Sequence, residues 1–157
     1  MTEALRPLEF LLGTWAGGGE GDWPTVGRFT YLEEMRFASG GGGEDFPFLE
    51  YTQRAWDPET GVTMHQERGF WRYGGDRVDV TLAHPIGVTE IGEGEVSDHS
   101  IRLVSTRVMQ ATTGLPVTGL LRSYRLEGED LLYEISLSTG EVPLTRHLTG
   151  KLARSGD

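Results

Sequence analysis

The sequence contains no cysteine and no asparagine, and Lys151 is its single lysine. Without cysteine, the chain has no disulfide framework, no thiolate zinc site, no iron–sulfur cluster and no cysteine nucleophile. Its formal net charge is −10, so it also lacks the basic face through which proteins release counterions from nucleic acids. Nucleic acid is therefore excluded as a general partner.

Long apolar runs are missing too. Apolar residues make up 37 % of the chain, and no stretch approaches the roughly 18 apolar residues that a membrane-spanning helix needs. Residues 1–7 carry Glu3 and Arg6 and lead into only a short apolar stretch, unlike a signal peptide. We therefore expect a protein that does not cross a membrane and that resides in the cytoplasm.

The length of 157 residues predicts one domain, residues 1–157, around one hydrophobic core. Glycine occurs 23 times and proline 7 times, which together stay below the share that signals disorder. The glycines are therefore expected to mark turns and close contacts within folded structure.

Helical periodicity occurs once, near the start of the chain. Leucines recur there at spacings of three and four, at positions 5, 8, 11 and 12. Pro7 is tolerated in a first turn, and Gly13 is a typical stop signal. The pattern predicts one short amphipathic helix.

From residue 13 onward the chain reads as short β-rich runs separated by turn residues. The predicted strands cover residues 14–19, 26–39, 48–56, 62–73, 77–83, 100–109, 117–126, 131–138 and 145–154, with a further short piece near Val88. In the longest run, Phe29, Tyr31, Met35 and Phe37 face one way, with Glu33 as the exception. One face of this strand is thus predicted to be buried and the other exposed to solvent.

About ten strands with short connections favour antiparallel neighbours that close or stack to remove their edges. We expect an all-β fold, a closed up-and-down barrel of ten antiparallel strands with the helix over one end; a two-sheet sandwich is the alternative. A barrel of this size is wider than its own side chains can fill, so its lumen would hold a ligand.

Three of the four histidines have ordinary structural explanations. His65 lies within a predicted strand, on the same face as Glu67 and Trp71, where a buried, hydrogen-bonded histidine is the simplest interpretation. His84 precedes a proline at a strand end and fits a packing role. His99 lies in a polar turn and is assigned no function.

The fourth histidine, His147, falls on the polar face of the last predicted strand, opposite Leu148 and Leu152. It would face the interior only if the lumen is partly polar or a bulge shifts the register. A zinc site made of His65, His84 and His147 is conceivable, but the spacing matches no known ligand pattern.

Other patterns are weaker. The glycine run 17–21 lacks the following helix and the lysine of a phosphate-binding loop. Carboxylate pairs such as Glu33 with Glu34, or Glu50 with Glu67, could act as acid and base. Among 24 acidic residues, however, such pairs arise readily by chance.

The segment 11–19 carries a Gly-x-Trp-x-Gly-x-Gly signature, with Gly13, Trp15, Gly17 and Gly19 in its fixed positions. With it the chain resembles the nitrobindin family. Further matches follow in order at residues 22–26, 29–33, 47–51, 64–67, 83–88 and 143–148. The resemblance spans residues 8–154 and implies a ten-stranded barrel that binds one ferric heme b per chain.

The resemblance also implies roles for individual residues. His147, in the segment Pro-Leu-x-x-His-Leu, corresponds to the axial ligand of the heme iron. The resemblance further places five residues at the cofactor, as neighbours or walls of the heme pocket: Thr25, Met64, His65, His84 and Leu137.

The implied activity is that of a heme-dependent peroxynitrite isomerase. Ferric iron with one histidine ligand keeps a position open, at which the family binds nitric oxide and converts peroxynitrite to nitrate, the iron acting as a Lewis acid. His65 would orient the bound anion. Small molecules are thus the expected partners, and a homodimer is compatible with the resemblance.

Two departures from the family bear on heme binding. Leu115 stands where relatives usually carry a basic residue that could pair with a heme propionate, and residues 138–141 replace a more apolar segment. Arg146 or Lys151 could supply the missing charge. Two alternatives to the heme protein therefore stay open: a heme-free carrier of a fatty acid or another apolar ligand in the same barrel, and a zinc hydrolase.

Overall fold

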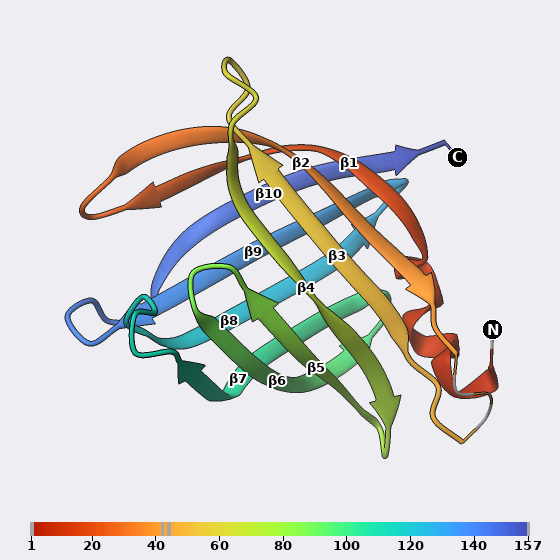
Figure 1. Ribbon diagram of the computed structural model, residues 1–157. Helices are drawn as coiled ribbons and strands as arrows, with labels where there is room; N and C mark the ends of the chain where they lie inside the picture. The colour runs from red at the N-terminus through yellow and green to blue at the C-terminus, as the bar shows by residue number, and fades with distance from the viewer. Residues whose placement is uncertain (1, 42, 44, 157) are drawn as a thin grey trace.

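Ten antiparallel strands wrap into a closed barrel in the computed structural model, which describes residues 2–41, 43 and 45–156 (Figure 1). The strands follow one another around the barrel in chain order, and β1 closes it by pairing with β10. The elements are η1 (Glu3–Leu11), β1 (Gly13–Trp23), β2 (Gly27–Ser39), β3 (Leu49–Trp56), β4 (Thr63–Gly74), β5 (Arg77–His84), β6 (Val88–Ser97), β7 (Ser100–Gln110), β8 (Val117–Glu127), β9 (Asp130–Thr139) and β10 (Thr145–Ser155). The predicted closed barrel is confirmed, and the sandwich is wrong.

Strand β6 differs most from its prediction, because it runs for ten residues where the sequence indicated a short piece near Val88. After Val88, its next three inward positions are occupied by Glu90, Gly92 and Gly94, so the apolar alternation that marks a strand is missing there. A Cβ at Gly94 would collide with the backbone carbonyl of Arg102 on β7. At Gly94 the neighbouring backbone therefore takes the place that a side chain would fill.

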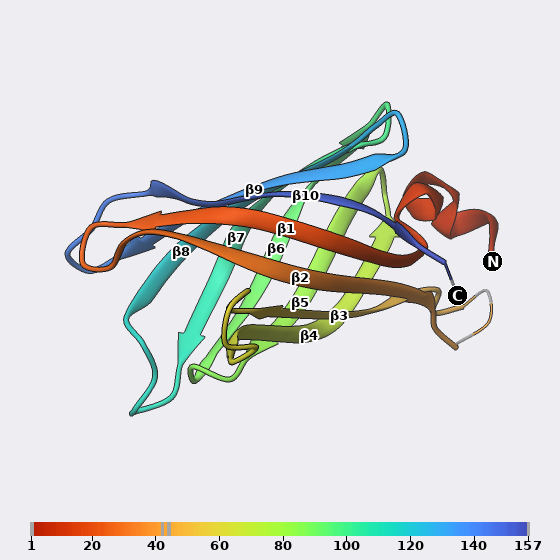
Figure 2. The same ribbon diagram turned by 90° about the horizontal axis from the view of Figure 1, so that it is seen from above.

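The N-terminal helix η1 is a 3-10 helix. Leu5, Leu8 and Leu11 are spaced by three residues, which places them on one face of a helix with three residues per turn, and all three are fully buried. Leu12 lies beyond the helix end, so its place in the predicted helix is wrong. The helix covers one end of the barrel (Figures 1 and 2).

The signature residue Trp15 joins this helix to the barrel. Its indole Nε1 donates a hydrogen bond to the Leu11 carbonyl at 2.7 Å, and the Arg154 guanidinium lies 4.2 Å from its ring centroid. Arg154 also donates to the Phe10 carbonyl at 2.9 Å. Trp15 is fully buried, so the motif builds the covered end of the barrel.

Two glycines on paired strands make room for two tyrosines. Gly19 pairs with Gly150, and a Cβ on either would overlap the ring of Tyr31 or Tyr133, respectively. The two hydroxyl groups meet at 2.6 Å inside the barrel. Glycine is thus required at Gly19 for close approach, as the signature suggests.

The opposite end of the barrel is open. Strands β7 and β8 pair only between residues 100–104 and 121–125, and beyond these pairs the ribbons diverge toward the loop that joins them (Figure 2). A cavity lies at this end. Within the described ranges, no helix has the length and apolar character needed to cross a membrane.

Candidate functional site

The open end of the barrel holds a cavity of about 480 Å³. This volume falls within the range of small-molecule sites, roughly 300–1,000 Å³. Apolar side chains from many strands form most of its wall, among them Met35, Val88, Leu120 and Ile135. A few polar groups reach into it, and these give the site its chemistry.

His147 reaches the cavity because strand β10 bulges. The pairing of β10 with β9 shifts between Arg146 and Leu148, so both His147 and Leu148 line the cavity. An inward-facing His147 requires a partly polar lumen or a bulge, and the structure shows the bulge.

The surroundings of His147 fix its protonation. Its Nδ1 lies 3.1 Å from the backbone carbonyl of Asp22, and a carbonyl can only accept, so Nδ1 carries the hydrogen. Burial lowers the pKa of His147, more than the bond to Asp22 raises it. The imidazole is therefore neutral at pH 7, with the lone pair on Nε2. Trp23 and Phe29 pack edge-on against the ring, at centroid distances of 5.1 and 6.0 Å.

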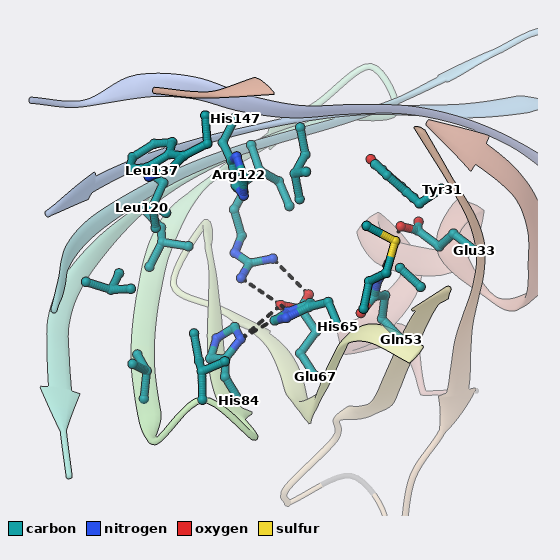
Figure 3. Close-up of a pocket in the computed structure, with 18 of the residues that line it drawn as sticks. Tyr31, Glu33, Gln53, His65, Glu67, His84, Leu120, Arg122, Leu137 and His147 are labelled. Carbon is teal, nitrogen blue, oxygen red and sulfur yellow. Dashed lines mark hydrogen bonds and ion pairs between the residues drawn. The ribbon is translucent and has the colours of Figure 1, made fainter. Parts of the chain in front are cut away.

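Two further histidines face His147 across the cavity, on β4 and β5 (Figure 3). His65 Nε2 lies 3.4 Å from His84 Nδ1. Glu67 Oε2 lies 3.5 Å from His65 Nε2 and 3.4 Å from His84 Nδ1. The structure thus brings His65 and His84 together with Glu67, while His147 stands on the opposite wall and outside this cluster.

Glu67 is held by a buried arginine. Arg122 on β8 makes two parallel bonds to its carboxylate, at 2.8 and 2.9 Å, and also contacts Glu90 Oε1 at 2.7 Å. Burial, the largest single influence, would raise the pKa of Glu67, but the Arg122 guanidinium together with His65 and His84 holds that pKa well below its usual range. Glu67 is therefore ionised at neutral pH, and both terminal nitrogens of Arg122 are engaged by buried carboxylates, which leaves only its buried Nε without a partner.

A second buried carboxyl, Glu33, lies beside the two tyrosines. Its Oε2 accepts hydrogen bonds from Tyr133 Oη at 2.6 Å and from Gln53 Nε2 at 3.1 Å. Burial raises the pKa of Glu33 to about 7, and these hydrogen bonds only partly offset the rise. Near neutral pH this carboxyl exists in both its protonated and its ionised form.

The remaining predicted heme contacts fall at or near the mouth. Met64 and Leu137 line the cavity. Thr25 is exposed in the turn between β1 and β2, flanked by cavity residues Trp23 and Val26 but not itself part of the wall. Leu115, which replaces the basic residue of relatives, lines the cavity and is half exposed.

Neither basic residue suggested as a replacement for that charge reaches the cavity. Arg146 pairs with Glu134 at 3.5 Å, and Lys151 pairs with Asp130 at 2.9 Å. Among the residues that the structure describes, Arg122 is the only arginine or lysine that lines the cavity. The structure thus places neither Arg146 nor Lys151 on the cavity wall, and their pairing with a heme propionate stays a prediction.

The ion cluster of Glu67, Glu90 and Arg122 was not predicted from the sequence. A signal was present in the alternation, because Arg122 lies between the inward-facing Leu120 and Tyr124. Glu33 gave the same signal between Tyr31 and Met35. A charge at an inward position of an apolar strand face indicates a buried polar network.

Comparisons with known proteins agree with this architecture. A profile of the family described as "THAP4-like, heme-binding beta-barrel domain" matches residues 4–154. The protein named peroxynitrite isomerase 1 from Mycobacterium tuberculosis is 41 % identical over 162 residues, covering 98 % of this chain and 96 % of the relative. The peroxynitrite isomerase of Nocardia farcinica is 40 % identical over 156 residues, covering 96 % and 89 %.

A solved structure has the same fold. The crystal structure of Rv2717c from M. tuberculosis matches with a TM-score of 0.89 at 38 % identity, covering 99 % of both chains. The resemblance identified from the motifs is thereby confirmed. The chain belongs to the family of THAP4-like, heme-binding β-barrel domains.

Proposed function

We propose that the cavity binds one ferric heme b per chain, with His147 Nε2 as the axial ligand of the iron. The observation that carries this proposal is the neutral imidazole whose Nδ1–H is bound to Asp22, which leaves the Nε2 lone pair for a metal. A hydrogen bond of this kind orients the ring and strengthens its basicity in metal sites. The residues present fit the group, since the wall around His147 is largely apolar and the cavity is open at one end.

The proposed activity is the isomerisation of peroxynitrite to nitrate, the activity for which the M. tuberculosis and N. farcinica relatives are named. When bound, ferric heme supplies a Lewis-acid iron with an open position. The reaction is a rearrangement, so it needs no external oxidant or reductant. The protein's part is to hold the imidazole of His147 neutral and fixed and to line the site with apolar side chains that exclude water.

Five further residues complete the proposed site. Thr25, Met64, His84 and Leu137 are proposed as heme neighbours, from their places at the mouth or on the wall. His65 is proposed as the residue that orients the anion, since it lines the wall opposite His147 and is only partly buried.

A fatty-acid carrier is the weaker candidate. The apolar wall would accept an alkyl chain, but a carboxylate needs a cation or several donors when it leaves water. Arg122 is already bonded to Glu67 and Glu90. A fatty-acid headgroup placed beside it would meet two buried carboxylates.

Titration of the heme-free protein with hemin tests the binding proposal. The wild type should develop a shifted Soret band that saturates at one hemin per chain. His147→Ala should lose that band, whereas His99→Ala, a change in an exposed turn, should behave as the wild type. Identical spectra for His147→Ala and the wild type would contradict the axial assignment.

Stopped-flow mixing of the hemin-loaded protein with peroxynitrite tests the activity. The wild type should accelerate peroxynitrite decay and raise the share of nitrate over nitrite in the products. Hemin-loaded His65→Leu should bind hemin but accelerate the decay less. Faster decay without a higher nitrate share would point to a reaction other than isomerisation.

Four further expectations stay predictions: nitric oxide as a ligand of the same iron, a homodimer as the assembled state, residence in the cytoplasm, and a single domain over residues 1–157.

A further inference from the structure

Three side chains on one wall of the cavity present metal-ligating atoms to one another. His65 Nε2, His84 Nδ1 and Glu67 Oε2 form a nearly equilateral triangle with sides of 3.4, 3.4 and 3.5 Å (Figure 3). Bond lengths of about 2.0–2.1 Å in a tetrahedral zinc site place neighbouring ligand atoms roughly 3.3–3.4 Å apart. The triangle therefore has the size of one face of a zinc tetrahedron before any metal enters.

The carboxylate has a lone pair free for a metal. Glu67 Oε1 accepts from Tyr51 Oη at 2.7 Å and from Arg122 at 2.8 Å. Oε2 accepts one short bond, from Arg122 at 2.9 Å, and otherwise has a long contact of 3.5 Å with His65 Nε2. A carboxylate oxygen offers about two acceptor positions, so one position of Oε2 is occupied only by the long contacts with the two imidazoles, which a metal would replace.

An outer carboxylate is in place behind one of the histidines. His84 Nε2 lies 3.8 Å from Glu90 Oε1. Among the described residues, His84 Nε2 and Glu90 Oε2 are buried without a hydrogen-bond partner, and Glu90 Oε1 has, besides this contact, only its ion-pair contact with Arg122 at 2.7 Å. Histidine ligands of metals commonly donate their second N–H to such a carboxylate, which sets the tautomer that coordinates through the other nitrogen. For His84 that other nitrogen is Nδ1, a corner of the triangle.

The charge balance also favours a cation here. Glu67 and Glu90 share one guanidinium, that of Arg122, and their side chains are no more than 4 % exposed. Two carboxylates against one cation leave a net negative charge in a dry environment, where an uncompensated charge is costly. A divalent cation at the triangle would supply the missing positive charge.

From these observations we propose a Zn²⁺ site formed by His65 Nε2, His84 Nδ1 and Glu67 Oε2. Two imidazoles and a carboxylate are a ligand set that zinc uses in catalytic sites, with the fourth position left to water. All three ligands line the cavity, so the fourth position opens into it. The site excludes His147 and is proposed for the heme-free protein, since His65 has its anion-orienting role only when heme is bound.

Zinc binding to the full chain, stripped of metal and heme, tests the site. We expect one Zn²⁺ per chain by calorimetry and by competition with a chromogenic chelator. His65→Gln and His84→Gln should each weaken binding at least tenfold. Glu90→Gln, which leaves Arg122 with one carboxylate partner, should weaken it about 10-fold to 100-fold through loss of the outer carboxylate.

Matched controls are His147→Gln on the opposite wall and His99→Gln in the exposed turn, both of which should bind zinc as the wild type does. Co²⁺ should give the visible absorption of a tetrahedral site in the wild type but not in His65→Gln. Circular dichroism checks that each variant is folded; His65 is partly exposed, so its replacement should fold. The absence of stoichiometric zinc binding in the wild type, or equal loss in His147→Gln, would overturn the proposal.

Discussion

Replacing the buried carboxyl of Glu33 by an amide should stabilise the protein above neutral pH. Burial raises the pKa of Glu33 from 4.5 to about 7 in the folded protein, whereas the unfolded chain titrates near 4.5. Between these two pH values the unfolded chain releases the proton and the folded protein retains it. Folding stability therefore falls as pH rises from about 4.5 to 7. Above pH 7, Glu33 is ionised in both states and causes no further loss of stability.

The size of the effect follows from the pKa difference. A shift of about 2.5 units at about 1.4 kcal/mol each gives about 3 kcal/mol of destabilisation at pH 8. In Glu33→Gln, the amide oxygen can still accept from Tyr133 and Gln53, and no charge is buried. For a chain of this length, each kcal/mol of unfolding free energy raises Tm by about 2–4 °C, so Glu33→Gln should raise Tm at pH 8 by roughly 6–12 °C.

Urea unfolding of the heme-free protein at pH 4 and pH 8, followed by tryptophan fluorescence, measures this gain. Glu34→Gln is the matched control, because Glu34 is the next residue on the strand and is exposed. We expect Glu33→Gln to raise the free energy of unfolding at pH 8 and to leave it nearly unchanged at pH 4. An equal gain at both pH values, or the same gain in Glu34→Gln, would refute it.

Three other substitutions test the remaining structural claims. Leu115→Lys places a cation at the cavity mouth and should tighten hemin binding about fivefold at low salt, or about 1 kcal/mol, with a smaller gain at high salt; equal gains would show that the charge is not responsible. Gly19→Ala inserts a Cβ against the Tyr31 ring and should cost about 1–3 kcal/mol in urea unfolding, while Gly74→Ala, whose Cβ meets open space, should cost far less. Arg122→Leu leaves two buried carboxylates unpaired and should cost about 3–5 kcal/mol at pH 7; a loss that does not shrink at acidic pH would contradict the charge argument.

Most of the barrel could be predicted because its strands obey simple alternation. The strand that did so least, β6, carries Glu90, Gly92 and Gly94 at its inward positions. Their burial depends on the neighbouring strands, through the backbone of Arg102 against Gly94 and the guanidinium of Arg122 beside Glu90. Local patterns do not contain such information, because the partners are distant in sequence.

The candidate site also has features that the sequence could predict and features that it could not. The position of His147 required a bulge, which changes the face of one residue and which alternation alone cannot locate. The cluster of His65, His84 and Glu67 depends on the register between β4 and β5, where Arg68 pairs with Ala83. The sequence predicted the inward face of His65 and Glu67 correctly, but the ion pair with Arg122, 55 residues away, needed the closed barrel to become visible.

The central claim is that the imidazole of His147 is the group that holds the heme iron. Hemin titration of His147→Gly with and without added imidazole tests it most directly, because the vacated space can admit a free imidazole. We predict that His147→Gly gives an altered, weak Soret band and that imidazole restores the wild-type spectrum and affinity, whereas N-methylacetamide does not. A wild-type spectrum in His147→Gly without imidazole would contradict the account.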